Sequence, residues 1–264
     1  MRCPQASPVK NFDELFERQI ELSIVLPCYN ERHRLPPYLD KILTYCDARF
    51  SDRYEVLISD DGGTDGMTAA LQPRYASRPE VRWLRYEQNR GRGAAYKQGV
   101  SASRGDLVLL ADADGATPIE EIEELFHRRQ SLQEALPGAT IGAICGLRTR
   151  ETAHRTWFRN VAGHVFRRLV RLIIGLPIHD TQCGFKLFDG ATARRIFPQC
   201  RENGWLCDIE ALMRIHRTGV PLGEAPVRWT EIPGTRVRFF QDALQMSQGL
   251  LRCRRSVCGE RPQT

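Results

Sequence analysis

Short apolar segments alternate with helix-forming stretches through the first part of the chain, and this alternation constrains the fold more than any other feature. Strands are predicted over residues 22–26, 54–59, 81–86 and 107–111. Helices are predicted between them, over residues 35–50, 65–75 and 94–103. Strands that helices connect form mainly parallel sheets with helices on both faces. The sequence therefore predicts an α/β fold with a Rossmann-like sheet.

The later part of the chain is less regular. Extended segments are predicted over 140–147 and 220–229, and amphipathic helices over 161–178 and 239–255. Arginines interrupt 161–178, so it lacks the run of about 20 apolar residues that a membrane-spanning helix needs. Such a helix lies either on a membrane surface or on the protein's own core. The predicted parts are an N-terminal extension, one large domain, and a basic C-terminal helix with a tail, over 1–20, 21–240 and 241–264.

Polar clusters follow all four of the early strands. They are Tyr29-Asn30-Glu31, Asp60-Asp61, the glycine loop 88–93 and Asp112-Ala113-Asp114. Sheets of this class bind their ligands at the carboxyl ends of the strands. The coincidence of four clusters at such ends predicts a single ligand site there, and it is a stronger signal than any one motif.

Asp112 and Asp114 are the most informative of these residues. Side chains alternate along a strand, so both carboxylates are expected on one face, just before Gly115 ends the strand. Two like charges about 5 Å apart cost roughly 3 kcal/mol at an effective dielectric constant of about 20. A cation between them removes this cost, and carboxylate oxygens suit Mg2+ or Mn2+, which are usually shared with substrate phosphates. The alternative is two solvated acids in a turn.

The charge balance agrees with a phosphorylated ligand. The net charge is +6 and comes mostly from arginine, whose planar guanidinium matches phosphate oxygens in pairs. Nucleotides, lipid headgroups and RNA would all suit such a chain. Nine cysteines contain no C-x-x-C pair and no signal peptide opens the chain, which predicts free thiols in a reducing cytosol.

Four motifs in this order resemble the family-2 glycosyltransferases, whose catalytic domain is the nucleotide-sugar-binding GT-A fold. The motifs occupy residues 25–31 (VLPCYNE), 60–65 (DDGGTD), 89–94 (NRGRGA) and 112–114 (DAD). The resemblance covers residues 21–240 and implies an inverting, metal-dependent glycosyltransferase.

Within the family, the chain looks most like the dolichyl- and polyprenyl-phosphate sugar synthases, and especially like the dolichyl-phosphate beta-glucosyltransferase branch. This likeness rests on residues 112–118 (DADGATP), 180–188 (DTQCGFKLF), Asp208 with Glu210, and 229–234 (WTEIPG). Two departures are the glycine at Gly63, where serine is usual, and the lack of the membrane helices found in many relatives.

The resemblance assigns the donor side of the site. It implies that Asp112 and Asp114 bind Mg2+ or Mn2+, which stabilises the departing diphosphate as a Lewis acid. Nucleoside contacts fall on Pro27, Tyr29, Glu31 and Asp60, with Asp60 accepting a hydrogen bond from uracil. Diphosphate contacts fall on Arg90 and Arg92, at a helix start where free N–H groups favour anions. Asp180 and Gln182 are expected in the donor-sugar pocket, while Asp61 and Asp65 are assigned to turn and helix capping.

The acceptor decides the mechanism. A lipid monophosphate, with a second pKa near 6 by analogy with phosphorylated side chains, is largely dianionic at neutral pH and needs no general base. It needs positive charge, for which Arg148 and Arg159, with Arg236 as a third candidate, are expected as its phosphate ligands. Asp208 lies where relatives that glycosylate hydroxyls carry their base, so a hydroxyl acceptor would require it to take a proton.

The expected function is transfer of a hexose, glucose from UDP-glucose, to a polyprenyl or dolichyl phosphate. The partners are then a nucleotide-sugar donor, a lipid-phosphate acceptor and a membrane surface, without nucleic acid. The expected location is peripheral, on the cytoplasmic face of the membrane.

Several alternatives stay open. GDP-mannose or UDP-N-acetylglucosamine could be the donor, and a sugar hydroxyl of a glycan could be the acceptor. A nucleotidyltransferase would share the sheet and the acids but carries its glycine loop after the first strand, whereas a basic binding module leaves the paired acids without a purpose.

Overall fold

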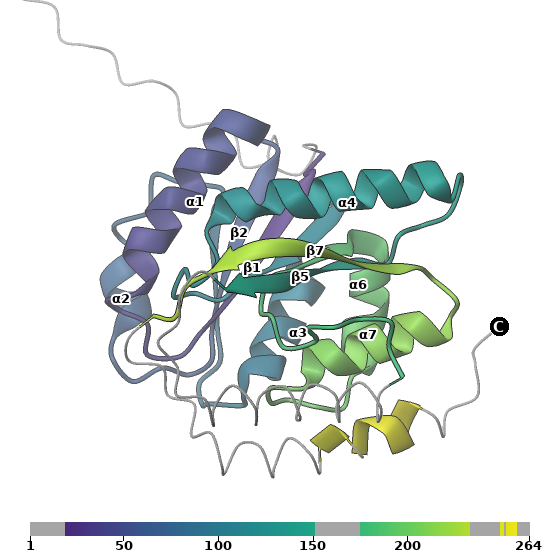
Figure 1. The fold of residues 1–264 in the computed structure, drawn as a ribbon. Helices are drawn as coiled ribbons and strands as arrows, with labels where there is room; N and C mark the ends of the chain where they lie inside the picture. The colour runs from purple at the N-terminus through teal and green to yellow at the C-terminus, as the bar shows by residue number, and fades with distance from the viewer. Residues whose placement is uncertain (1–18, 151–174, 233–248, 251, 258–264) are drawn as a thin grey trace, which may run out of the picture.

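The computed structural model describes residues 19–150, 175–232, 249–250 and 252–257, and they form a three-layer α/β domain (Figure 1). A seven-stranded sheet has the order β3-β2-β1-β4-β6-β5-β7. The strands are β1 Leu22–Cys28, β2 Tyr54–Asp60, β3 Val81–Arg85, β4 Leu107–Leu110, β5 Ala143–Arg150, β6 Lys186–Asp189 and β7 Leu222–Trp229. All adjacent pairs are parallel except those of β6 with β4 and β5.

Helices cover both faces of the sheet, as predicted, because side chains of buried strands alternate between two apolar cores. They are α1 Leu35–Phe50, α2 Met67–Leu71, α3 Arg92–Ala102, α4 Ile122–Ala135, α6 Gly190–Ile196 and α7 Cys207–Arg217. Ile24 and Leu26 of β1 face the core under α1, α2 and α4. Val25 between them faces the core under α3, α6 and α7.

Local details differ from the prediction at two places. The helix predicted over 65–75 is only Met67–Leu71, because Gly66 has a positive φ of 73° at its start and Pro73 follows closely. β4 ends at Leu110, so Asp112 and Asp114 lie in a loop and not on a strand. The prediction that strand alternation aligns them was therefore wrong, although they stay adjacent at the end of β4.

The structure describes only the carboxyl ends of the two segments predicted as amphipathic helices. Residues 175–178 are not helical, and Gly175 has a positive φ of 69°, so the predicted end of the first helix at 178 was wrong. Residues 161–174 and 239–248 lie outside the described residues. Leu250, Cys253 and Val257 are buried in the same core as α7, so this end of the second helix turns its apolar side towards the protein. In the described part of the chain no helix is long and apolar enough to cross a membrane. The division of the chain at residues 20 and 240 stays a prediction.

Candidate active site

The predicted clusters meet at one edge of the sheet. β1 and β2 are parallel and in register, so Cys28 lies beside Asp60 where both strands end. β6 runs the opposite way, and its first residue, Lys186, pairs with Leu110 at the end of β4. The segment that precedes β6 therefore reaches the same edge as the loop that follows β4, and the start of α7 joins them.

The loop after β4 holds two carboxylates close together. Asp114 accepts a hydrogen bond from the backbone N–H of Ala116 at 3.1 Å. Burial, and next the negative charge of Asp112, raise the pKa of Asp114 above its ordinary value. Gly115 makes the turn with a φ of 70°, where any side chain would press on the Tyr38 ring. The like-charge pair that the sequence predicts is present.

Arg92 contacts one carboxylate of this pair directly. Its guanidinium forms an ion pair with Asp112 and hydrogen bonds with the Tyr96 hydroxyl. The ring centroid of Trp205 lies 5.0 Å from the guanidinium carbon. Burial would lower the pKa of Arg92, but the Asp112 carboxylate outweighs it and the pKa is raised. Arg92, predicted as a diphosphate contact, thus lies directly beside the predicted metal carboxylate, and its contact with a diphosphate stays a prediction.

The glycine loop does not present the free N–H groups that we expected. Asp61 accepts hydrogen bonds from the backbone N–H groups of Arg90 and Gly91, both at 2.8 Å. The Asn203 carbonyl accepts those of Gly93 at 2.7 Å and Ala94 at 3.2 Å. The prediction of an anion site on these amides was wrong, because two partners distant in sequence occupy them. Asp61 thereby organises the loop as well as its own turn.

The glycines of this loop allow close packing. A side chain at Gly91 would collide with the Asn203 carbonyl, and one at Gly93 would collide with Cys207. The Arg90 guanidinium lies 4.6 Å from the centroid of the Tyr86 ring. The role of the Arg90 and Arg92 side chains in binding an anionic ligand stays a prediction.

The predicted nucleoside residues lie at the ends of β1 and β2. Asp60 is fully buried, and its Oδ1 accepts from the Gly63 N–H at 2.8 Å. Its Oδ2 accepts from the Thr68 hydroxyl at 2.5 Å and from Arg85 at 2.8 Å. Both oxygens are engaged within the protein, so a uracil ring would have to share them. The role of Asp60 in nucleoside binding stays a prediction.

The other nucleoside candidates surround the same turn. Pro27 lies in β1, Tyr29 is 39% exposed, and Glu31 is held by Arg34 at 2.7 and 2.5 Å. Asn30, with a φ of 58°, accepts hydrogen bonds from the N–H groups of Thr64 and Asp65. Asp65 in turn accepts from the N–H of Met67, the first residue of α2, at 3.0 Å, although the N-cap position of this helix is Gly66.

Arg148 and Asp180, predicted on opposite sides of the reaction, form one ion pair. Arg148 donates from Nε to Asp180 Oδ2 at 2.7 Å and from Nη2 to Oδ1 at 2.9 Å. Burial would raise the pKa of Asp180, but the hydrogen bond and charge of Arg148 hold it below its usual range. The N–H of Gln182 points to the same carboxylate. Arg159 and Arg236 lie outside the described residues.

Asp208 has a partner that sequence reasoning missed. Lys186 is fully buried, and its Nζ lies 2.5 Å from Asp208 Oδ2 and 2.5 Å from the Cys183 carbonyl oxygen. Burial would lower the pKa of Lys186, but the adjacent carboxylate of Asp208 raises it. The sequence signal for this contact was a lysine that directly precedes the apolar residues Leu187 and Phe188.

A divalent cation fits the carboxylates of Asp112 and Asp114. Both present hard oxygen atoms, and Asp112 is paired with Arg92, so a bound divalent cation would share this carboxylate with the guanidinium or replace it there. Within the described ranges, no three His, Cys, Asp or Glu side chains gather closely enough to hold a metal by themselves. Mg2+ and Mn2+ are usually held by one or two carboxylates together with substrate phosphates.

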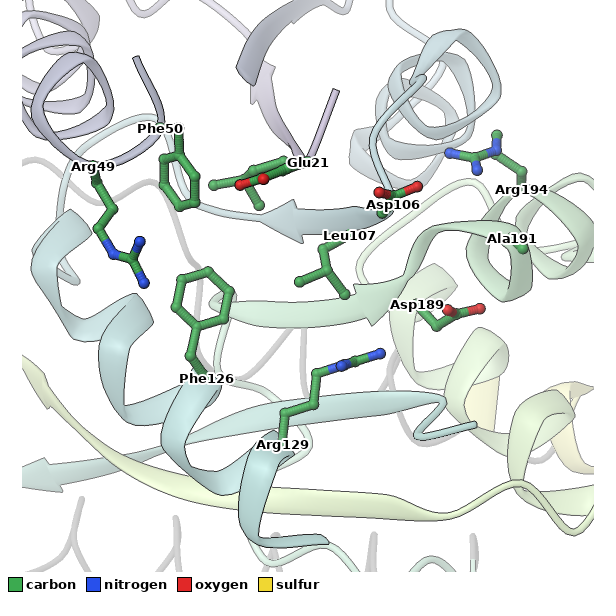
Figure 2. Close-up of a pocket in the computed structure, with 11 residues that line it drawn as sticks. Glu21, Arg49, Phe50, Asp106, Leu107, Phe126, Arg129, Asp189, Ala191 and Arg194 are labelled. Atoms are coloured by element: carbon green, nitrogen blue, oxygen red, sulfur yellow. The ribbon is translucent and has the colours of Figure 1, made fainter. Parts of the chain in front are cut away.

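A separate cavity of about 530 Å³ opens at the opposite edge of the sheet (Figure 2). Leu22 and Leu107, at the amino ends of β1 and β4, lie in its wall with Phe50 and Phe126. Arg129 also lines it, and its buried Nε has no hydrogen-bond partner in the described part of the chain. None of the predicted site residues lines this cavity, so it is not the candidate active site.

The site and fold can now be compared with known proteins. The sequence profile of "Glycosyl transferase family 2" matches residues 23–197. The chain is 37% identical to the dolichyl-phosphate beta-glucosyltransferase of Dictyostelium discoideum over 249 residues, which cover 89% of this chain and 74% of that protein. It is also 37% identical to the Homo sapiens protein of that name over 243 residues, covering 88% and 74%.

Solved structures share the fold. Glucosyl-3-phosphoglycerate synthase from Mycobacterium tuberculosis, in complex with Mn2+ and uridine-diphosphate-glucose, matches with a TM-score of 0.62 and 19% identity, covering 98% of this chain and 86% of that one. Its complex with Mn2+, uridine-diphosphate and phosphoglyceric acid matches with a TM-score of 0.64 and 18% identity, covering 98% and 86%. At these identities the likeness shows the fold alone, and it confirms the predicted α/β class of GT-A type.

Proposed function

The chain belongs to glycosyl transferase family 2, and we propose that it transfers glucose from UDP-glucose to the phosphate of a dolichol or related polyprenol. The names of the relatives support this substrate pair, since proteins 37% identical over most of the chain are dolichyl-phosphate beta-glucosyltransferases. The observation that carries the proposal is the placement of Asp112 and Asp114 beside Arg92 at the carboxyl end of β4. In this grouping the two carboxylates would bind a divalent metal ion, and the Arg92 guanidinium would bind the diphosphate.

On the donor side, each residue has a distinct task. Asp112 and Asp114 would hold Mg2+ or Mn2+, and the bound ion would stabilise the charge that develops on the diphosphate. Arg92 lies beside Asp112, and its fixed contacts with Tyr96 and Trp205 keep the guanidinium at the site. We assign Arg92 to the diphosphate and Arg90 to the rim of the same site.

On the acceptor side, the chemistry needs a bound phosphate and no strong base. A phosphate oxygen of the lipid attacks the anomeric carbon while the bond from that carbon to the UDP oxygen breaks, and its electrons leave with UDP. Attack from the opposite face inverts an α-linked donor into a β-glucosyl phosphate. Because the acceptor is already dianionic at neutral pH, no proton has to be removed.

The contacts of Asp208 and Arg148 favour a phosphate over a hydroxyl acceptor. Asp208 Oδ2 already accepts a hydrogen bond from the buried ammonium of Lys186 at 2.5 Å, so Asp208 has a structural partner inside the protein. Arg148 is fixed by Asp180 and backed by the Trp229 ring at 5.4 Å. We assign Arg148 to the acceptor phosphate, with Arg159 and Arg236 as further candidates. The lipid substrate implies action at a membrane surface, and we propose a peripheral position on its cytoplasmic face.

Transfer assays with each of three labelled nucleotide-sugar donors test the proposal. The protein is incubated with polyprenyl phosphate in detergent and with radiolabelled UDP-glucose, GDP-mannose or UDP-N-acetylglucosamine, with Mn2+ or Mg2+, and the lipid is extracted. We expect label from UDP-glucose alone, and its loss in Asp114→Asn but not in Glu134→Gln, an exposed acid on α4. Label from another donor, or full activity of Asp114→Asn, would contradict the assignment.

A further inference from the structure

Lys186 is the most unusual buried residue near the site. It is the first residue of β6, and its side chain is 1% exposed. Its Nζ touches a carboxylate from α7 on one side and the Cys183 carbonyl from its own preceding loop on the other. An ammonium in the apolar core is costly unless its charge and its hydrogens find partners, and here a carboxylate neutralises the charge and two of the three hydrogens have acceptors.

Stability alone is a poor reason for this arrangement. A buried ion pair is often no more stabilising than apolar side chains of similar volume, because both charges lose their hydration. Residues of α7 on either side of Asp208, Cys207 and Ile209, belong to the apolar core, so the pair lies at the edge of that core. The pair is therefore better explained by what it holds in position.

The pair connects the two halves of the candidate site. Asp208 lies in the first turn of α7, on the acceptor side. The Cys183 carbonyl belongs to the turn that continues to Gly184, and Gly184 packs so closely on Asp112 that a side chain there would collide with the carboxylate. One ammonium thus fixes both the acceptor-side acid and the turn that lies against the donor-side metal carboxylate.

We propose that Lys186 is a positioning residue for glucosyl transfer, which keeps the Cys183–Gly184 turn against Asp112 and Asp208 in register with it. Lys186 does not touch substrate, because its side chain is buried. Its effect passes through Asp112 and Asp208, so its loss should change the geometry of the metal carboxylate and the rate of transfer more than the affinity for the nucleotide. The inference rests on the proposed function.

A matched ion pair lies further along the same helix. Arg214 and Glu210 of α7 are paired at 2.9 Å, and their side chains are 6% and 0% exposed. Arg214 also donates a hydrogen bond to the Ser256 hydroxyl at 3.2 Å. Arg214→Met therefore removes from α7 a cation that is buried about as deeply as Lys186. This variant measures how the loss of a buried ion pair alone affects stability and activity.

The test compares Lys186→Met, Lys186→Gln and Arg214→Met in the full chain. Melting temperature reports stability, the transfer assay gives kcat and KM for UDP-glucose, and electron paramagnetic resonance gives the affinity for Mn2+ in the presence of UDP. We expect kcat of Lys186→Met to fall by about tenfold or more while KM changes by less than about threefold. Mn2+ should bind several-fold more weakly, whereas Arg214→Met should lose stability but keep kcat and Mn2+ affinity.

Lys186→Gln keeps donors for Cys183 and Asp208 without the charge, and it should recover part of kcat. It also serves as the main variant if Lys186→Met does not fold. The double variant Lys186→Met with Asp208→Asn should be no slower than the slower single variant, because the two residues act as one unit. Equal kcat and Mn2+ affinity in the Lys186 and Arg214 variants, or multiplicative losses in the double variant, would overturn the proposal.

The two proposals can fail separately. If the wild-type protein glucosylates no lipid phosphate, the proposed function fails. The Mn2+ and UDP binding of the Lys186 variants would still decide whether this lysine holds the metal carboxylate.

Discussion

Asp180→Asn removes half of the ion pair between Asp180 and Arg148, and its cost can be worked out from the structure. The wild-type carboxylate accepts two hydrogen bonds from the guanidinium, at 2.7 and 2.9 Å. Asparagine keeps one oxygen but places an NH2 group against the second donor. The variant therefore loses the charge and one hydrogen bond, and it leaves Arg148 with a half-buried, unpaired edge.

The expected loss of stability lies between two limits. Breaking a fully buried pair costs about 3–5 kcal/mol, whereas an exposed pair contributes about 0–1 kcal/mol. The side chains of Arg148 and Asp180 are 25% and 6% exposed, so we expect about 2 kcal/mol. In a domain of this size, that loss lowers the melting temperature by about 4–8 °C.

The pH dependence has a definite sign. The pKa of Asp180 is lowered in the folded protein, so the pair stabilises the fold above the unfolded-state pKa of about 3.9 and loses this effect as pH falls through the lower folded-state pKa. The difference between wild type and Asp180→Asn should be complete at pH 7 and shrink below about pH 4.

Urea unfolding at pH 7 and at about pH 3 measures both the size and the sign. Glu21→Gln is the matched control, since its pair with Arg53 is 38% and 54% exposed and should be worth less than about 1 kcal/mol. The KM for polyprenyl phosphate should rise in Asp180→Asn, because Arg148 loses its fixed orientation. A stability loss below about 0.5 kcal/mol at pH 7, or one that grows in acid, would refute the reasoning.

Two further changes test the packing around the metal carboxylates. Gly184→Ala should weaken Mn2+ binding and lower kcat, because the new methyl group collides with the Asp112 carboxylate. Gly204→Ala is the control and should change neither quantity, because nothing lies within 4 Å of the added atom. The same Mn2+ affinity and kcat in both variants would contradict the contact of Gly184 with Asp112. Trp205→Ala should lower kcat/KM for UDP-glucose about fivefold, since a partly exposed cation–π contact with Arg92 is worth about 1 kcal/mol. An unchanged kcat/KM would remove Trp205 from the support of Arg92.

The sequence predicted most of the sheet because its signals are local. Apolar runs bounded by turns marked β1 to β4, and the family motifs placed Asp60, Asp112 and Asp180 at one edge. Strand β6 was missed because four residues are too few for a clear alternating pattern, and its antiparallel pairing with β4 is set only in the folded sheet. The comparisons decide against the nucleotidyltransferase and binding-module alternatives, since the family profile spans residues 23–197.

The errors in the site have a common physical cause. The amides of the glycine loop were expected to be free, but Asp61 and Asn203, distant in sequence, accept their hydrogen bonds. Lys186 and Asp208 were not paired for the same reason, since the contact joins β6 to α7. Side-chain type and spacing indicate that charged groups gather at this edge, but only the tertiary fold determines which of them neutralise one another.

The most direct test of the account compares dolichyl phosphate with dolichol as acceptors, with UDP-glucose and Mn2+, and determines the anomeric configuration of the product by NMR. We predict β-glucosyl phosphate from dolichyl phosphate and no product from dolichol. Transfer to dolichol, an α-linked product, or no transfer to either lipid would contradict the assignment of this chain to inverting transfer onto a lipid phosphate.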